Sequence, residues 1–252
     1  MNGIVLYRGP STIDHAQIVA VATGLINGAK NSKTGPMVQI YILRADLNPI
    51  AAVQSGEDVS ICGPCVHRGR IIVDEKTGLR RNVDRSCYVT LMHGPRVVYS
   101  ALQRGAYIDV PPKAARQLLA HRKVRIGAYG DPGAVPSDVW SVVLDKVEDL
   151  TGYTHLWRQH PELSNWCMAS CDTEEEREEA KALGFRTYRV RSSGSPVLKG
   201  EGRCPASAEL GKAVQCIQCM LCGGNRTKAK ADLTIEAHGT GANHFQRAQA
   251  LA

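Results

Sequence analysis

Continuous apolar runs alternate with amphipathic stretches over most of the chain. The run 37–44, MVQIYILR, follows a polar turn and is almost entirely apolar, which is typical of a buried strand. Core strands are predicted at 37–43, 124–130, 153–157, 166–171, 185–190 and 232–237. Helices are predicted at 111–123, 137–150 and 172–184. This alternation predicts an α/β protein with a parallel sheet or barrel.

The remaining segments decide how far such a barrel closes. The six core strands are fewer than the eight of a closed TIM barrel. Segments 3–8 and 87–92 are candidates for the missing strands, whereas the Ala-rich stretch 12–30 predicts a helix. We therefore expect an α/β fold, a partial or complete parallel (β/α) barrel, formed by residues 1–252 as a single domain.

Seven of the nine cysteines fall into two groups with metal-ligand spacing. The first group lies in a loop, 62–87, whose segment 66–86 predicts an inserted hairpin with a Lys-Thr-Gly turn. The second group lies in the carboxyl-terminal segment 204–222. The two sets are Cys62, Cys65 and Cys87, and Cys204, Cys216, Cys219 and Cys222. Four protein ligands close a metal site, whereas three leave a position open for a substrate or cofactor.

The spacing also bears on which metal each group binds. Three cysteines within seven residues and a distant Cys204-Pro205 are similar to ferredoxin-type ligation, which favours an iron–sulfur cluster in the second group. Four thiolates are equally suited to a structural zinc ion. The first group is compatible with a cluster that has one open iron, or with a zinc hairpin in which His67 is the fourth ligand. Cys167 and Cys171 are expected to be buried thiols.

Composition and charge narrow the possible partners. The chain is 43% hydrophobic and only 5% aromatic, and its net charge is +7. A basic stretch, 67–85, makes a nucleotide or nucleic-acid partner possible. No apolar run approaches the ~20 residues needed to cross a bilayer, and the amino terminus has no signal-peptide pattern. We therefore expect a cytoplasmic protein with reduced cysteines and no membrane contact; the oligomeric state stays open.

Polar residues follow several predicted strands at their carboxyl ends, where parallel α/β folds bind ligands. Asp131, His155 and Asp172 are the candidate catalytic residues. The turn after the 124–130 strand is the candidate cofactor-binding segment: Tyr129, Gly130, Asp131, Pro132 and Gly133. Two simpler interpretations compete, because Asp172 could cap the helix that begins at Thr173 and His155 could be a packed core residue.

The order of these parts resembles the radical S-adenosylmethionine (SAM) superfamily: a strand, a three-cysteine loop, a strand ending in Gly130-Asp131-Pro132, and a cysteine-rich tail. The family loop usually reads CysxxxCysxxCys, whereas twenty-one residues separate Cys65 from Cys87 here. The resemblance implies a six-stranded partial barrel and a [4Fe–4S] cluster on Cys62, Cys65 and Cys87. It also implies that SAM binds the open iron and the 130–132 turn, and that the tail holds a second cluster or Zn²⁺.

The chain is also similar to small phage-encoded families of uncharacterised proteins. The shared features are the Cys87-Tyr88 pair, the Gly130-Asp131 strand end, and a CysPro…CysxxCysxxCys tail. This second resemblance implies that the chain is encoded by a phage or mobile element.

Together these features favour an iron–sulfur, radical SAM-like enzyme that modifies a nucleotide or nucleic acid. One alternative is a zinc-containing TIM-barrel base-exchange enzyme, like the guanine transglycosylases that install 7-deazaguanines, with Asp131 or Asp172 as its nucleophile. Another alternative is a zinc-stabilised nucleic-acid-binding module that uses the 67–85 hairpin.

Overall fold

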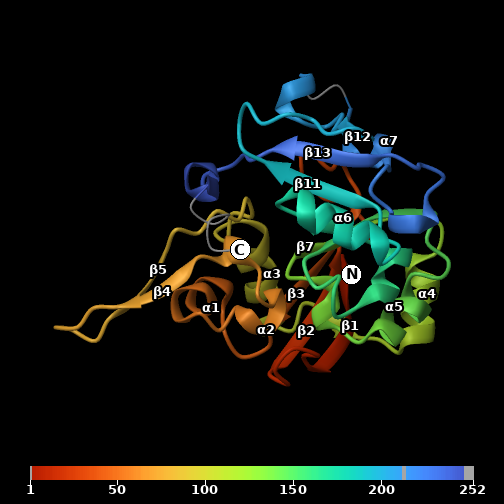
Figure 1. Ribbon diagram of the computed structural model, residues 1–252. Helices are drawn as coiled ribbons and strands as arrows, with labels where there is room; N and C mark the ends of the chain where they lie inside the picture. Colours follow the sequence, from red (N-terminus) through yellow and green to blue (C-terminus); the bar gives the residue numbers. More distant parts are fainter. Residues whose placement is uncertain (1, 212–213, 247–252) are drawn as a thin grey trace.

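The computed structural model describes residues 2–211 and 214–246, which form a mixed α/β structure with parallel sheet regions (Figure 1). The predicted α/β class is confirmed. The strands are β1 (Gly3–Pro10), β2 (Gln17–Thr23), β3 (Val38–Arg44), β4 (Arg70–Val73), β5 (Arg80–Val83), β6 (Ile108–Asp109), β7 (Lys123–Tyr129), β8 (Asp149–Thr151), β9 (Tyr153–Thr154), β10 (Met168–Cys171), β11 (Thr187–Arg191), β12 (Glu201–Arg203) and β13 (Asp232–Glu236).

Helices are short and connect these strands. The α-helices are α1 (Pro49–Ser55), α2 (Val59–Cys62), α3 (Gly94–Gln103), α4 (Pro112–Leu119), α5 (Ser137–Val143), α6 (Glu174–Ala182) and α7 (Cys216–Cys219). Single 3-10 turns are η1 (Val66–Arg68), η2 (Pro132–Ala134), η3 (Pro161–Asn165), η4 (Ala208–Leu210), η5 (Gly224–Arg226) and η6 (Ala242–His244). Within the described residues, no helix has the length and apolar character needed to cross a bilayer.

The strands form two larger sheets and one hairpin. The six-stranded sheet has the order β6-β1-β2-β3-β7-β8. Its β1, β2 and β3 are antiparallel neighbours, whereas β3, β7 and β8 run parallel. The five-stranded sheet has the order β12-β13-β11-β10-β9, and all of its pairs are parallel. The carboxyl ends of neighbouring parallel strands therefore meet at a shared edge.

Gly152 links the two sheets, because it is the single residue between β8 and β9. A Cβ at this position would lie 2.5 Å from the side chain of Ile126, so only glycine permits this crossing. The Gly152 N–H donates to the carbonyl of Cys222 at 3.0 Å, and its own carbonyl accepts from the N–H of Met168 at 3.0 Å. A main-chain hydrogen bond thus joins Gly152, where the chain crosses between the sheets, to the second cysteine segment.

Three of the predicted elements differ from the structure. The helix predicted at 12–30 is wrong, because Gln17–Thr23 forms strand β2 in the middle of the six-stranded sheet. A strand covered on both faces is apolar at every position, so its composition resembles that of a buried helix. Segment 87–92 contains no strand, and the strand predicted at 153–157 ends at Thr154.

The inserted hairpin predicted within 66–86 is confirmed. Strands β4 and β5 pair in antiparallel register, from Arg70 opposite Val83 to Val73 opposite Arg80. Figure 1 shows this hairpin projecting from the rest of the chain as a narrow arm. The end of β5 therefore lies beside the start of β4, so the chain leaves the first cysteine loop and re-enters it at neighbouring positions.

A buried ionic network joins α6 to the five-stranded sheet. Arg177 is 5% exposed, and its guanidinium lies 2.8 Å from the Asp232 carboxylate and 3.6 Å from that of Glu201. We expect Arg177→Ala to lower the free energy of unfolding by about 3–5 kcal/mol, because it leaves the buried Asp232 carboxylate without its cation, whereas Glu201 keeps its pairing with Arg189. Urea denaturation measures this loss.

The matched control for this prediction is Arg8→Ala. The Arg8–Asp109 pair is solvent-exposed on both sides, so its loss should cost less than about 1 kcal/mol. Equal decreases in the free energy of unfolding for the two variants would contradict the stabilising role assigned to the buried Arg177–Asp232 ion pair.

Candidate functional site

Residues of both sheets line a cavity of about 530 Å³. Alternate residues of the strands line it, as the two-residue period of a strand requires. The lining pairs are Gln39 and Tyr41 on β3, Arg125 and Tyr129 on β7, Tyr188 and Val190 on β11, and Leu233 and Ile235 on β13. All seven cysteines of the two groups also line this cavity. Strands of both sheets and both cysteine groups thus face one space.

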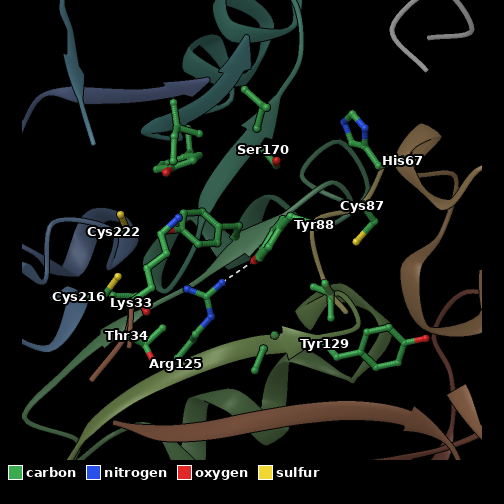
Figure 2. Close-up of a pocket in the computed structure, with 18 of the residues that line it drawn as sticks. Lys33, Thr34, His67, Cys87, Tyr88, Arg125, Tyr129, Ser170, Cys216 and Cys222 are labelled. Atoms are coloured by element: carbon green, nitrogen blue, oxygen red, sulfur yellow. Dashed lines mark hydrogen bonds between the residues drawn. The ribbon is translucent and has the colours of Figure 1, made fainter. Parts of the chain in front are cut away.

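The two cysteine groups occupy different ends of this cavity. Figure 2 shows Cys87 on one side and Cys216 and Cys222 on the other, with the hydrogen bond from Arg125 to the Tyr88 hydroxyl between them. Strand β7 connects the two regions. Its third residue, Arg125, interacts electrostatically with Cys216 and Cys222, whereas its last, Tyr129, interacts with Cys62 and Cys87.

The first cysteine group is built on the connection from β3 to the hairpin. Cys62 ends α2, and Cys65 directly precedes η1. Arg68 supports this loop, because it pairs with the buried carboxylate of Asp58 at 2.7 Å and donates to the carbonyls of Gly56 and Gly63. These contacts hold the loop in shape.

The hairpin explains the long gap before the third cysteine of this group. After β5, the N–H groups of Ser86 and Cys87 both donate to the carbonyl of His67, at 3.2 and 3.0 Å. The twenty-one residues between Cys65 and Cys87 thus leave the cavity and return to it. The structure brings all three cysteines of the group to the same end of the cavity.

Burial governs the acidity of these three thiols. Burial raises the pKa of Cys62 well above its usual value, raises that of Cys65 to about 11, and raises that of Cys87. Thiolates, not thiols, bind metals, so metal binding here must displace protons. The nearby hydroxyl of Tyr129 is buried without a hydrogen-bond partner. An unsatisfied polar atom at a cavity wall is typical of a position where a ligand binds.

The second cysteine group surrounds one turn of helix. Helix α7 begins with Cys216 and ends with Cys219, and the left-handed conformation of Met220 (φ 48°) turns the chain toward Cys222. Cys204 follows β12, and its N–H donates to the carbonyl of Thr234 on β13 at 2.9 Å. Burial raises the pKa of Cys222 to about 12. All four cysteines lie on short, backbone-anchored segments.

Two cations, the half-buried Lys33 and the buried Arg125, accompany this second group. Burial lowers the pKa of Lys33, while Cys204, Cys216 and Cys222 favour its charged form. Arg125 is 7% exposed and lies 5.4 Å from the centre of the Tyr153 ring. Within the described residues, no carboxylate lies within 4.0 Å of either cation. Two positive charges therefore lie beside the four thiols of this group.

The spacing of the sulfur atoms bears on the metal. Zinc binds thiolates at about 2.3 Å, which places the sulfurs of a tetrahedral site about 4 Å apart. Across the described residues, no three cysteine sulfurs lie within 4.8 Å of one another. An iron–sulfur cubane binds each thiolate to a different iron and spreads its ligands more widely. The described cysteines are therefore not arranged as a preformed tetrahedral zinc site.

The three predicted catalytic residues lie together at the carboxyl ends of β7, β9 and β10. The Asp131 carboxylate accepts from the Gly133 N–H, the Thr154 hydroxyl and the His155 N–H, at 2.7–2.9 Å. Burial raises the pKa of Asp131, against the effect of these hydrogen bonds. With three protein donors on its carboxylate, Asp131 is suited to positioning His155.

Asp172 contacts a histidine from the first cysteine loop. Its carboxylate lies 2.8 Å from Nε2 of His67, and the Nδ1 of His67 lies 2.6 Å from the Ser86 hydroxyl. Burial raises the pKa of Asp172, but the hydrogen bond and charge of His67 outweigh this effect and lower it. The capping interpretation is wrong, because Thr173 caps α6 by accepting from the Glu176 N–H. Both ring nitrogens of His67 are thus engaged by Ser86 and Asp172, which disfavours a zinc hairpin with His67 as fourth ligand.

The predicted cofactor-binding segment 129–133 divides into two parts. Tyr129, Gly130 and Asp131 line the cavity, whereas Pro132 and Gly133 are buried and do not line it. Gly130 has φ 77°, and a Cβ there would lie 2.7 Å from the Ile42 carbonyl oxygen. The turn therefore needs glycine to approach β3 this closely.

Sequence reasoning missed several residues of the cavity wall. Lys33 lies in a turn before β3, and Tyr88 lies in the loop after Cys87. Arg125 carried a usable signal, since it is a single charged residue within the otherwise apolar run VRIGAY. His67 was considered only as a zinc ligand, although it meets Asp172 across 105 positions of sequence.

Comparisons of this chain with protein-family models, with curated proteins and with solved structures give no match.

Proposed function

We propose that this protein is an iron–sulfur, radical SAM-like enzyme. Cys62, Cys65 and Cys87 would hold a [4Fe–4S] cluster with one open iron. The second group, Cys204, Cys216, Cys219 and Cys222, would hold a closed centre. The observation that carries the proposal is that a three-cysteine group and a four-cysteine group line different ends of one cavity.

The strand arrangement supports a partial barrel for this enzyme. Strands β3, β7 and β8 are parallel neighbours in chain order, and β9, β10 and β11 continue this order across Gly152. Strand β13 lies parallel to β11. Since alternate residues of these strands face the cavity, we propose that it is the interior of an open (β/α) barrel.

The chain's own residues would bind and orient the reactants. Bound at the first cysteine group, the cluster and SAM would together supply one-electron chemistry. The Tyr129 hydroxyl, buried and without a partner, lies beside that group and is available to hydrogen-bond a cofactor. The Thr151 hydroxyl, also buried without a partner, lines the same cavity. These unsatisfied groups support ligand binding along the whole cavity.

The charge and aromatic content of the cavity favour an anionic, nucleotide-like substrate. Lys33, Arg85 and Arg125 line it, and no carboxylate of the described chain lies within 4.0 Å of their charged groups. Tyr88 and Tyr153 contact Arg125. Cations bind phosphate and aromatic rings stack on bases, so this combination suits a nucleotide. A volume of about 530 Å³ is also within the usual range for small-molecule sites.

Metal and sulfide analysis tests the proposal directly. Protein purified without oxygen should contain iron and acid-labile sulfide, and its visible absorption should bleach with dithionite. Zinc alone, in a colourless protein, would contradict the iron–sulfur assignment. It would favour the zinc-containing base-exchange enzyme or the zinc-stabilised nucleic-acid-binding module.

A substitution in the cavity tests the substrate class. We expect Arg125→Met to weaken the binding of nucleoside 5′-monophosphates by roughly 10-fold or more, because hydrogen bonds to a charged group contribute about 1.5–3 kcal/mol. Isothermal titration calorimetry measures this change, with Arg8→Met, an exposed arginine outside the cavity, as the control. Equal affinities for wild type and Arg125→Met would contradict a role for Arg125 in binding the anion.

A further inference from the structure

We propose that His67, His155 and Asp172 form a third metal site, which binds a single divalent transition-metal ion. One ligand atom from each residue lies within 4.8 Å of the other two. This group contains no cysteine. The proposal is therefore independent of which metal the cysteine groups hold, and it goes beyond the iron–sulfur function proposed above.

The distances fit ligands that share one ion. Nitrogen and oxygen ligands lie about 2.0–2.2 Å from zinc, so two ligands at a right angle are about 3 Å apart. Nε2 of His67 and the Asp172 carboxylate oxygen are 2.8 Å apart. Two histidines and one carboxylate with open positions are a known donor set for iron(II) and zinc. The donor types and their spacing thus agree with a mononuclear site.

His155 supplies the second, independent observation. Its Nε2 atom is buried and has no hydrogen-bond partner. A buried ring nitrogen without a partner loses its hydration and gains nothing in exchange. The main chain holds this residue in place, because the His155 N–H donates to the buried carboxylate of Asp131 at 2.7 Å. A metal ion at this position would satisfy the nitrogen.

The surroundings of His67 are those of a metal ligand. Its Nδ1 lies 2.6 Å from the Ser86 hydroxyl, which fixes the ring orientation and leaves Nε2 directed at Asp172. Phe245 stacks on the ring at a centroid distance of 5.2 Å and an interplanar angle of 6°. The rings of His67 and His155 meet edge to face at 5.7 Å.

The site also has access to the cavity. Both His67 and His155 line the cavity, and Figure 2 shows His67 at the same end as Cys87. Any open coordination position of the ion would therefore face the space in which the substrate is proposed to bind. An ion there could hold an oxygen or nitrogen atom of that substrate.

Manganese(II) is the appropriate probe, because it prefers oxygen and nitrogen ligands to thiolates. Protein dialysed against a chelator is titrated with MnCl₂, and free Mn²⁺ is followed by its electron paramagnetic resonance signal. We expect one bound Mn²⁺ per chain. His155→Gln and Asp172→Asn should abolish this binding, and Ser86→Ala should weaken it by roughly 10-fold by releasing the ring of His67.

Two controls separate this site from its surroundings. His238→Gln, in the same cavity but outside the group of three, should bind Mn²⁺ like wild type. Cys62→Ala should also keep the Mn²⁺ site while its iron content falls, so failure of the iron–sulfur proposal and failure of this one are distinguishable.

Two results would overturn the inference: no tight Mn²⁺ binding by wild type, or unchanged binding in His155→Gln and Asp172→Asn. The thermal stability of the metal-free His155→Gln protein adds an independent readout. A histidine with a merely structural role should destabilise the chain when replaced. A metal ligand with an unpaired nitrogen should leave the metal-free stability unchanged.

Discussion

Replacing Cys62 with alanine is expected to remove the iron of one cluster and abolish catalytic activity. The group that would hold this cluster has only three cysteines, so the loss of one leaves two thiolates, too few to retain a cubane. The side chain lies at the end of α2, in a loop that Asp58 and Arg68 hold in shape. The fold should therefore survive, and iron analysis with the visible spectrum should report the loss.

Cys171→Ala is the matched control for this variant. Cys171 is fully buried in β10 and belongs to neither cysteine group, so its replacement removes a sulfur without touching either centre. Its iron content should equal that of wild type. Full iron content in Cys62→Ala would contradict the proposed ligand set.

Replacing Cys222 with alanine is expected to lower both the metal content and the stability of the protein. The main chain of Cys222 is anchored at the junction of the sheets, where its carbonyl accepts from the Gly152 N–H. Its thiol, which the substitution removes, interacts with Tyr153 and lies near Lys33. A bound group present at a thousandfold excess over its Kd contributes about 4 kcal/mol to stability. At about 2–4 °C per kcal/mol, its loss should lower the Tm by roughly 10 °C.

Differential scanning calorimetry and metal analysis check this prediction together. Cys167→Ala removes another fully buried sulfur near Gly152, and thus controls for the packing change alone. We expect only the Cys222 variant to lose metal. A Cys222→Ala protein with unchanged metal content and unchanged Tm would show that the second group holds no stabilising centre.

Cys62→Ala and Cys222→Ala should also differ in the property that they impair most. Cys62 lies in a loop that Asp58 and Arg68 hold in shape, whereas Cys204, Cys216 and Cys222 of the second group lie in a separate apolar cluster with Met37, Tyr188 and Leu233. Three buried thiols beside the cations Lys33 and Arg125 are poorly satisfied without a metal. We therefore expect the first centre to matter mainly for activity and the second mainly for folding.

Several features of the fold and site could be predicted from the sequence. The strand at 37–43 and the hairpin within 66–86 were predicted because their local patterns, an apolar run and a Gly-containing turn, depend on few distant contacts. Asp131, His155 and Asp172 were placed at one edge because the carboxyl ends of parallel strands meet there. The prediction for 12–30 was wrong, since only the neighbours of β2 reveal that both of its faces are covered.

By itself, the sequence determined the alternation of strands and helices, the grouping of seven cysteines and the position of polar residues after strands. Each of these is encoded by residues a few positions apart. Tertiary structure alone decided that both cysteine groups face one cavity and that His67 meets His155 and Asp172. His67 and Asp172, for example, are 105 positions apart. Such contacts depend on strand register, on the return of the hairpin and on the sheet crossing at Gly152, all of which are set by packing of the whole chain.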